Sequence, residues 1–588
     1  MQIADIADFL QKQGFFPERR VLSFDEDARE VFVGYRRIAG LESNVCVGIV
    51  VSPNRAAWPE VYLLDWHKDR GLRDVLQNRH VNVYGRVCYI DEESSWWSAA
   101  DTERQAAQML LYLDELLEMV SANNVPLADV LQHFPAYWNA EAQVYASEGL
   151  EPGKLYQIVA VENRAGTAGW LIPQDSSDKS SLAQWALEQP YRLSTGMVCL
   201  DLQGSPGDLP VVDLPSTVSQ VISWLMQSSV SNDSLDRHIY KVVEKAFSER
   251  FGTKHRRIDA RDNRPLCVGL ACNWRLSDHI YGAFGVLLEI PLASAKTIMS
   301  RRGKQAHGLL LKCHAKASRY DIKDGSTAFI HSRNTPGLET LEDKRVVLIG
   351  VGAIGGFLAQ ILAHAGAGLG KKGKLTLIDP DDFDVPNISR HLLGAGALGK
   401  PKVEAMKKSL QSALPYLKIE AIPFNVGSQL EKVWNSDIVI NATGSESVAI
   451  ELETDARQHN AVVPILHGWI AGHGSAIEGL LNPRQGKHAC FRCLYHEVAG
   501  TLSRRHSILR DVESSAPVIH GCGASFYQYG TSTPMAAASL MGQMTRDWAS
   551  GKSKHTLRHH VLDMEACENR QGSTPLSSKD CPLCAKNG

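Results

Sequence analysis

The alternation of apolar and polar positions in the C-terminal half of the chain predicts a strand, a turn, a helix and a second strand. The apolar run 346–349 leads into a glycine turn, and apolar residues then recur at helical spacing up to Leu362. A second apolar run, 375–378, ends at Asp379. The turn has the spacing G-x-G-x-x-G, with its glycines at Gly350, Gly352 and Gly355. Such a unit is typical of a Rossmann-like α/β domain.

This glycine turn predicts a nucleotide-binding site. Because the glycines have no side chains, the backbone can approach a phosphate group closely and direct the N–H groups of the helix N-terminus toward it. Asp379 follows the second strand, where a Rossmann-type unit places an acid for a ribose hydroxyl. By itself the pattern also fits a dehydrogenase or a crossover that binds no ligand.

The polar residues after Asp379 favour another chemistry. A second acid, an amide and two cations follow in the order Asp381, Asn387, Arg390 and Lys402. A dehydrogenase has no need of this series, whereas an enzyme that adenylates a carboxylate must gather a triphosphate with cations and neutralise its charge with a metal ion. We therefore expect ATP and Mg²⁺ as cofactors.

The N-terminal pattern predicts a smaller α+β domain. Apolar residues from Ile3 to Leu10 share one helical face, and strand-like runs follow at 31–35, 45–51 and 61–65. A long helix with an apolar face comes later, through Met109, Leu110, Leu113, Leu116 and Leu117. The expected arrangement is a helix, an antiparallel meander and a second helix.

The middle of the chain predicts a further α/β domain without a recognisable motif. Strand-like runs lie at 155–161, 168–172, 267–272 and 285–290, and helical patterns lie at 216–226 and 234–251. The polar stretch 321–340 is interpreted as a linker. The predicted domains of this α/β multidomain chain are residues 1–150, 151–330 and 331–588.

Composition narrows the class of protein. The chain has 588 residues, and at about 150 residues per domain three or four domains are expected. A net charge of −3 gives no indication of a nucleic-acid-binding surface. No apolar run is long enough for a membrane span, and the N-terminus lacks a signal-peptide pattern. Twelve cysteines then predict thiols and metal ligands in the cytosol rather than disulfides.

Two C-x-x-C pairs predict a structural zinc site. The four thiolates would come from Cys490, Cys493, Cys581 and Cys584, which suits tetrahedral Zn²⁺ and would fasten the C-terminus to the domain. One alternative leaves these thiols unpaired. Another makes Cys490 or Cys493 a catalytic thiol, although a thiolate bound to zinc is already occupied.

From about residue 338 onward the chain resembles the ubiquitin-activating superfamily, which includes the sulfur-carrier adenylyltransferases of thiamine and molybdopterin synthesis. Their pattern is G-x-G-x-x-G, D-x-D, N-x-x-R-Q and G-x-x-K, and here His391 replaces the glutamine. Relatives then have D-x-T-D-N, whose second aspartate holds magnesium, but this position is Gly444. Glu446, Asp381 or the phosphates themselves are the remaining candidates for holding Mg²⁺.

The same resemblance implies a catalytic thiol at Cys522. Thiamine-synthesis relatives have a lone cysteine in this loop, before a turn and a helix, and Gly521 and Gly523 flank Cys522 here. Flanking glycines leave the backbone free to move and the sulfur accessible to an acyl-adenylate. The alternative is a buried structural cysteine.

A second candidate thiol, Cys88, lies in a segment that resembles the ubiquitin-conjugating enzymes. Those enzymes carry H-P-N, a short loop with a glycine and then the catalytic cysteine, and here His80, Asn82 and Gly85 precede Cys88 in that order, with valine in place of the proline. When an amine attacks a thioester an oxyanion forms, and the asparagine amide can donate to it or order the loop that does. The alternative is a small apolar residue in a core strand.

Together the two ends resemble bacterial fusions of a ubiquitin-conjugating-like domain and an activating domain, found with cyclic-oligonucleotide antiphage signalling systems. The resemblance implies adenylation of a partner protein's C-terminal glycine, a thioester on Cys522, transfer to Cys88 and conjugation to a target amine. It implies a cyclic GMP–AMP synthase-like nucleotidyltransferase as the partner and a homodimer. A biosynthetic sulfur-carrier adenylyltransferase and a non-catalytic nucleotide-binding scaffold, suggested by Gly444, are the alternatives.

Overall fold

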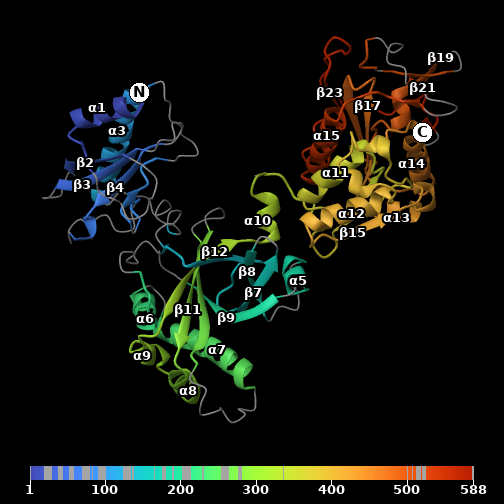
Figure 1. Cartoon of the computed structure of the whole chain (residues 1–588). Coiled ribbons are helices and arrows are strands. Elements are labelled where there is room, and N and C mark those ends of the chain that lie inside the picture. Colours follow the sequence, from blue (N-terminus) through green and yellow to red (C-terminus); the bar gives the residue numbers. More distant parts are fainter. Residues whose placement is uncertain are drawn as a thin grey trace. The chain divides into compact units, whose positions relative to one another are not determined.

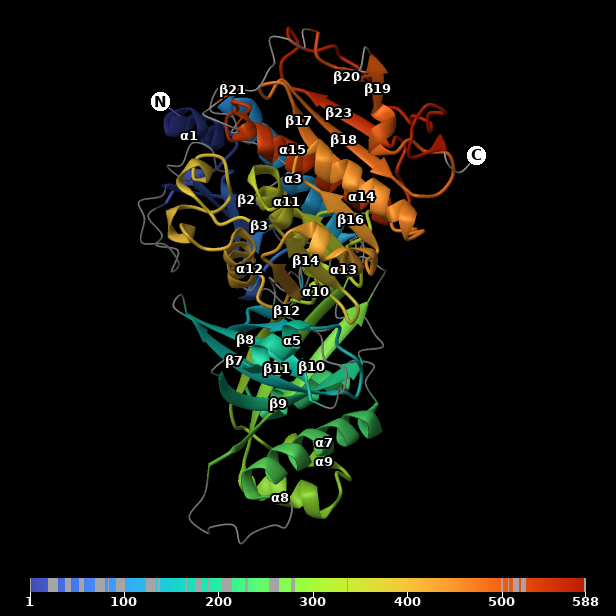
Figure 2. The ribbon, with the colours of Figure 1, turned by 90° about the vertical axis from the view of Figure 1, so that its right-hand side faces the viewer.

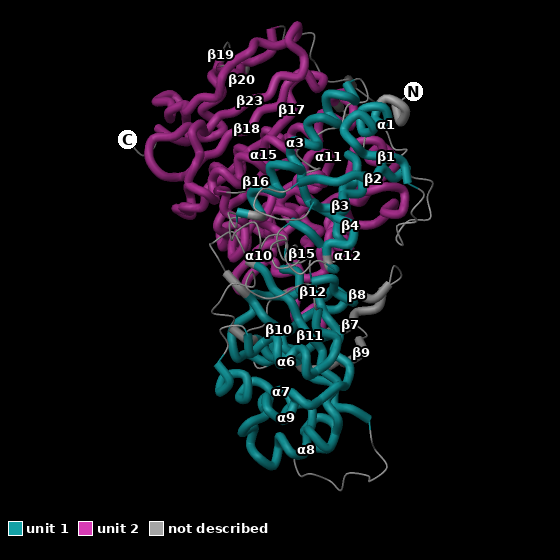
Figure 3. The backbone as a smooth tube through the Cα atoms, turned by 90° about the vertical axis from the view of Figure 1, so that its left-hand side faces the viewer, with its two compact units in different colours: residues 1–177, 189–324 teal, residues 178–188, 325–588 magenta. Residues whose placement is uncertain are grey.

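The computed structural model divides the chain into two compact units, residues 1–177 with 189–324 and residues 178–188 with 325–588 (Figures 1 and 3). The structure describes residues 2–18, 30–37, 44–51, 58–68, 80–82, 84–90, 101–122, 134, 138–163, 166–174, 181–188, 191–201, 214–227, 231–252, 264–275, 281–335, 337–498, 501–505, 507–510, 518–519 and 525–585.

The N-terminal part of the first unit is an antiparallel meander with two helices. The strands pair in sequence order, as predicted: β1 (Phe16–Pro17), β2 (Glu30–Arg37), β3 (Asn44–Val51), β4 (Glu60–Leu64) and β5 (Arg86–Val87). A short turn of 3₁₀ helix, η1 (Trp66–Lys68), follows β4. The helices α1 (Gln2–Lys12) and α3 (Thr102–Ser121) share one apolar core with the sheet. This confirms the predicted helix, meander and second helix.

The rest of the first unit is organised around a closed barrel. Its strand order is β10-β11-β12-β6-β8-β7-β9. The strands are β6 (Ala142–Ala146), β7 (Leu155–Asn163), β8 (Gly166–Pro173), β9 (Tyr191–Asp201), β10 (Leu266–Arg275), β11 (Tyr281–Ile290) and β12 (Ala317–Asp324). The helices are α6 (Val218–Gln227), α7 (Asn232–Phe251), α8 (Leu292–Ser300) and α9 (Ala306–Leu310). The predicted strands and helices of this region are present, but their closure into a barrel was not predicted.

The barrel is filled by side chains. Met197 is fully buried, and a Cβ added at Gly269 would lie 2.8 Å from its terminal methyl group. The absence of a side chain on β10 therefore makes room for the methionine on β9. In a separate apolar cluster, Trp138, Trp224 and Phe284 pack together, with ring centres 4.7–5.3 Å apart. These aromatic rings join β11 to the helical side of the core.

The linker predicted at 321–340 is wrong for much of that stretch. β12 continues to Asp324 and pairs with β11 on one side and β6 on the other. A short helix, α10 (Thr327–Ser332), follows, and the side chain of its N-cap residue Ser326 accepts a hydrogen bond from the Phe329 N–H. Polar side chains do not prevent a strand when neighbouring strands satisfy its backbone on both sides.

The second unit is a sheet covered by helices on both faces (Figure 2). The strand order is β15-β14-β13-β16-β17-β18-β23, parallel from β15 to β17 and antiparallel beyond. The strands are β13 (Arg345–Ile349), β14 (Lys374–Ile378), β15 (Ile419–Ile422), β16 (Ile438–Asn441), β17 (Ile465–Ala471), β18 (Ala476–Asn482) and β23 (Leu557–Val561). The predicted Rossmann-like fold is confirmed.

Alternate residues of the strands face the two layers of helices. Val346 and Leu348 share a core with α11 (Ala353–His364), α12 (Lys402–Ala413) and α15 (Ser532–Ala549). Val347 and Ile349 face α13 (Leu430–Trp434) and α14 (Glu446–Gln458) instead. A parallel strand buried on both faces has this continuous apolar sequence because neither face meets water.

Short elements complete the structure. They are α5 (Ser181–Glu188), the 3₁₀ turns η3 (Val385–Asn387), η4 (Ala395–Ala397), η5 (Val426–Ser428) and η6 (Phe491–Leu494), and the strand pairs β19 (Tyr495–Val498) with β20 (Thr501–Arg504) and β21 (Val518–Ile519) with β22 (Ser525–Phe526). Within the described ranges, no helix combines the length and apolar character needed to cross a membrane.

We predict that Trp138→Ala destabilises the first unit strongly. The indole is buried, packs on Phe284 and donates a hydrogen bond from Nε1 to the Tyr320 carbonyl oxygen at 3.0 Å. Replacing a buried tryptophan with alanine typically costs about 3–5 kcal/mol. Urea unfolding should show this loss, whereas Leu111→Ala, on the exposed face of α3, should leave the transition within about 0.5 kcal/mol.

Candidate active site

The glycine turn lies where the order of strands reverses. β14 and β16 flank β13 on opposite sides, so the turn after β13 is at the switch point where open α/β sheets bind ligands. Gly350 has a φ of 84°, and a Cβ at Gly355 would lie 1.8 Å from the Gly350 carbonyl oxygen. These two positions therefore require glycine for α11 to begin directly against the turn.

A buried carboxylate fixes this turn to the end of β14. Asp379 is 6% exposed and accepts hydrogen bonds from the backbone N–H groups of Val351 at 2.6 Å and Asp381 at 2.9 Å. Burial raises the pKa of the Asp379 carboxyl. Asp379 is predicted to bind a ribose hydroxyl, and its hydrogen bonds also hold the glycine turn in shape.

A cavity of about 420 Å³ opens over the turn. It brings together five of the predicted nucleotide-binding residues: Gly350, Gly352, Asp379, Asp381 and Lys402. Lys402 is largely buried, and its Nζ lies 2.7 Å from Oδ2 of Asp381. An ammonium held in the wall of a cavity in this way is suited to an anionic ligand such as a triphosphate.

Three predicted residues are not among those that line this cavity. Gly355 lies in the first turn of α11. Asn387 closes the η3 turn, where its Oδ1 accepts a hydrogen bond from the Asp384 N–H at 3.0 Å. The Arg390 guanidinium lies 5.7 Å from the ring centre of Tyr529, which does line the cavity. Tyr529, which lies just before α15, belongs to no recognisable sequence motif and was therefore not predicted.

His391 holds the glycine turn through a hydrogen bond to the Val351 carbonyl oxygen. Its Nδ1 accepts a hydrogen bond from the Leu393 N–H at 2.9 Å, so its Nε2 carries the proton and donates it to the Val351 carbonyl oxygen at 2.8 Å. Burial lowers the pKa of this imidazole. The sequence identified His391 only as a replacement for glutamine, and a glutamine could make the same two contacts.

A second cavity, of about 530 Å³, adjoins the first. Both cavities are lined by Gly444, Ile470 and Tyr527. Glu446 lines the second cavity, where its Oε1 accepts a hydrogen bond from the Tyr495 hydroxyl at 2.6 Å. Of the two carboxylates considered for magnesium, Asp381 lines the cavity over the glycine turn and Glu446 lines only the second cavity.

The four cysteines of the C-x-x-C pairs come together. Their sulfur atoms all lie within 4.8 Å of one another, and the recorded separations are 3.5–3.7 Å: Cys490 to Cys493, Cys581 and Cys584, and Cys493 to Cys584. A tetrahedral site with zinc–sulfur bonds of about 2.3 Å has sulfur–sulfur edges of about 3.8 Å. The cluster therefore has the size and donor set for such an ion, and these distances are far longer than a disulfide.

Cys88 is exposed, directly after β5. Its N–H donates to the His80 carbonyl oxygen at 2.7 Å, and Asn82 Oδ1 accepts from the N–H groups of Tyr84 and Arg86, both at 2.9 Å. A Cβ at Gly85 would lie 2.4 Å from the Leu63 carbonyl oxygen. The segment is thus a tight loop that presents the cysteine at the surface, in contrast to the alternative of a core residue.

Trp58 and Pro59, which the sequence places before this loop, lie beside it. The Tyr89 hydroxyl donates to the Pro59 carbonyl oxygen at 2.6 Å, and the rings of Tyr89 and Trp58 meet edge to face. These contacts fix the residue that follows Cys88. Cys522, the other predicted thiol, lies outside the described residues.

The fold and this site define the class. Residues 327–584 match the ThiF family, and the parallel sheet, the glycine turn and the four-cysteine cluster all lie within them. The chain therefore contains a ThiF-type adenylating domain, and this match supports ATP as the nucleotide.

Similarity to individual proteins extends beyond that domain. The chain is 28% identical to the ATP-dependent ubiquitin transferase-like protein Cap2 of Pseudomonas aeruginosa and 23% identical to that of Vibrio cholerae, with 86% of each chain covered. It is 30% identical to the molybdopterin-synthase adenylyltransferase of Escherichia coli over 27% of this chain and 61% of that protein. These similarities confirm the expected fusion with an adenylating domain and the expected class of enzyme.

We predict that His391→Gln makes the second unit less sensitive to acid. Because burial lowers the pKa of His391, the unfolded chain binds a proton at this residue more readily, so the free energy of unfolding falls as the pH drops below about 7. Glutamine keeps both hydrogen bonds and cannot titrate.

Thermal unfolding across pH 7.5 to 5.5, taken as roughly one unit either side of an ordinary imidazole pKa, measures this effect. His560→Gln, at an exposed position on β23, is the control and should follow the wild type. A His391→Gln curve parallel to that of the wild type would contradict the prediction.

Proposed function

We propose that this enzyme adenylates the C-terminal glycine of a partner protein and conjugates that carboxyl group to a target amine. The observation that supports it most is the cavity over the glycine turn, which joins a phosphate-binding turn, Asp379 and Lys402 to a second cavity at Gly444. One cavity would take ATP, and the other would admit the end of a peptide chain. The two ligands would then meet where the cavities adjoin.

In the first step the glycine carboxylate attacks the α-phosphorus of ATP, the bond to the β,γ-phosphates breaks, and pyrophosphate leaves. The N–H groups of the turn and the Lys402 ammonium would stabilise the phosphate charge. Mg²⁺ would be held by Asp381 and by the phosphates, because Gly444 offers no carboxylate.

The second step forms a thioester. We propose that the Cys522 thiolate attacks the carbonyl carbon of the acyl-adenylate and that AMP leaves. Cys88 then attacks the thioester, so that the acyl group passes to its sulfur and the thiol of Cys522 is restored. The exposure of Cys88 and the tight loop at Asn82 support this role. A target amine finally attacks the Cys88 thioester, the carbon–sulfur bond breaks, and an amide forms as the thiol of Cys88 is restored.

The four cysteines would hold Zn²⁺ as a structural ion. Zinc would supply a cross-link between the η6 segment and the C-terminal segment, and none of the chemical steps would pass through it. We propose a cyclic GMP–AMP synthase-like nucleotidyltransferase in an antiphage system as the partner. The resemblance on which this rests also suggests a homodimer in the cytoplasm.

We predict that Cys522→Ala abolishes every thioester and that Cys88→Ala leaves one. Purified protein, ATP, Mg²⁺ and a glycine-ended nucleotidyltransferase would be mixed and separated on non-reducing gels, with a reduced sample as the control for thioesters. Cys267→Ala, outside the proposed pathway, should behave as the wild type. Persistence of a thioester without Cys522 would show that another residue is the first thiol.

The same gels distinguish the alternative function. A sulfur-carrier adenylyltransferase would use its adenylating domain alone, so Cys88→Ala would then leave product formation unchanged. A loss of conjugation with retention of one thioester is the result expected for the relay.

A further inference from the structure

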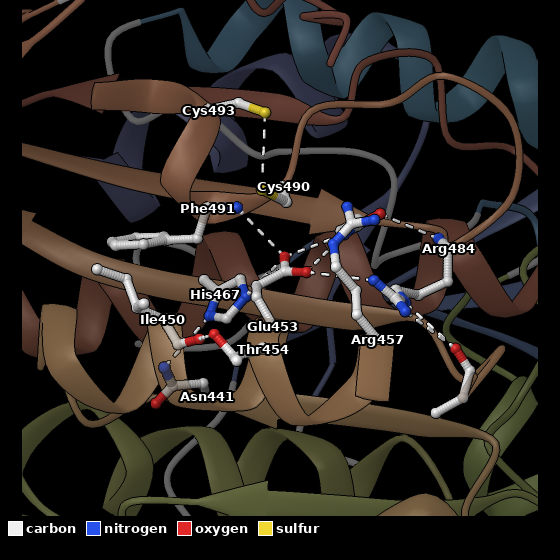
Figure 4. A network of polar contacts seen from close by, with 12 residues as sticks. Asn441, Ile450, Glu453, Thr454, Arg457, His467, Arg484, Cys490, Phe491 and Cys493 are labelled. Carbon is white, nitrogen blue, oxygen red and sulfur yellow. Dashed lines mark hydrogen bonds and ion pairs between the residues drawn. The ribbon is translucent and has the colours of Figure 1, made fainter. Parts of the chain in front are cut away.

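A buried carboxylate on α14 lies at the centre of a polar network in the second unit (Figure 4). Glu453 is fully buried. It accepts hydrogen bonds from Asn482 Nδ2 at 2.9 and 3.0 Å, the Phe491 N–H at 3.2 Å and Arg484 Nη1 at 3.5 Å. Burial alone would raise the pKa of Glu453, but His467, Asn482 and Arg484 together hold it below its ordinary value. The carboxylate therefore lies among hydrogen-bond donors from three residues.

On one side the network leads to the junction of the two cavities. His467 Nε2 lies 3.5 Å from Glu453 Oε1, and its Nδ1 lies 3.2 Å from Asn441 Nδ2. Asn441 Oδ1 in turn accepts hydrogen bonds from the Thr443 N–H at 3.1 Å and the Thr443 hydroxyl at 2.8 Å. The Thr443 Oγ1 accepts from the Ser445 N–H at 3.1 Å. The turn around Gly444 is thus shaped by Asn441.

On the other side the network reaches the four-cysteine cluster at two points. Glu453 accepts a hydrogen bond from the N–H group of Phe491, which follows Cys490 in the sequence. One turn further along α14, Arg457 Nη2 lies 3.0 Å from Cys584 Sγ. Figure 4 shows Glu453 and Arg457 side by side, with Phe491 and Cys490 near Glu453. One helix therefore contacts Cys584 directly and the η6 segment that follows Cys490.

We propose that Glu453 is a positioning residue that couples the four-cysteine cluster to the turn at residues 441–445. A metal ion in the cluster fixes the position of η6, and with it the Phe491 N–H. Glu453 and His467 transmit that position to Asn441. This inference deepens the proposed function, because residues 441–445 lie where ATP and the peptide would meet.

Glu453→Gln tests the coupling with little change in volume. A neutral amide has one acceptor and one donor group, so it cannot accept from all the donors that surround Glu453. The sulfur ligands are unchanged, so Zn²⁺ should remain at one ion per chain. Glu451→Gln is the matched control, because Glu451 lies on the same helix at an exposed position.

Backbone hydrogen exchange, read by mass spectrometry, would be followed in both variants and in the wild type, each with Zn²⁺ and after its removal by a chelator. In zinc-loaded Glu453→Gln, exchange in residues 441–446 should be roughly tenfold faster or more than in the zinc-loaded wild type, as for the loss of a hydrogen bond to a charged group. Zinc removal should produce the same increase in the wild type and in Glu451→Gln, and little further increase in Glu453→Gln. Residues 345–349, in β13, should be unchanged throughout.

Slow exchange at 441–446 in the zinc-free wild type would overturn the proposal. This comparison uses the wild-type protein alone, so it does not depend on the folding of any variant. An equal further increase on zinc removal in Glu453→Gln would also overturn it, because the two effects would then be independent. Uniformly faster exchange that includes β13 would show general loosening in place of coupling. The readout uses neither ATP nor a partner, so an enzyme that failed to adenylate would refute the proposed function and leave this test intact.

Discussion

The shape of the candidate active site depends on one buried carboxylate. Asp379 ends β14 and accepts hydrogen bonds from Val351 in the glycine turn and from Asp381 in the next segment. Val351 packs in the core, but the glycines on either side of it have no side chains to restrain the backbone. The carboxylate supplies that constraint, and His391 supplies a second one through the Val351 carbonyl oxygen. Asp379 and His391 both bind Val351, so this residue of the turn is held through its backbone N–H and its backbone C=O.

Because the turn has a fixed shape, residues from several segments of the chain can line one cavity beside it. With the turn fixed, Lys402 on α12 and Tyr529 before α15 line the same cavity, although more than a hundred residues separate them in the sequence. On the far side, β16 ends at Asn441 and the chain turns at Gly444, where the second cavity adjoins the first. The parallel sheet thus gathers its ligand-facing residues at the carboxyl ends of its strands, as in other open α/β folds.

Much of this could be predicted where the signal is local. Gly350, Gly355 and the two C-x-x-C pairs have fixed spacings because a tight turn and a tetrahedral cluster each need them, and the sequence located all of them. The barrel could not be predicted in this way, since its closure depends on pairing between β12 and β6, which are far apart in the chain. Glu453 and His467 were missed for the same reason, because a buried pair drawn from α14 and β17 has no spacing rule. Polarity also misled the prediction of a linker at 321–340, because pairing on both sides stabilises β12.

In the proposed function, the cavity over the glycine turn activates a carboxylate with ATP. Exchange of labelled pyrophosphate into ATP measures this step directly, without any thiol. The account predicts exchange that requires Mg²⁺ and a glycine-ended nucleotidyltransferase, and that is lost when the C-terminal carboxylate is blocked as an amide or when Gly355 is replaced by alanine. Exchange that does not depend on the free carboxylate, or no exchange with any glycine-ended partner, would contradict it.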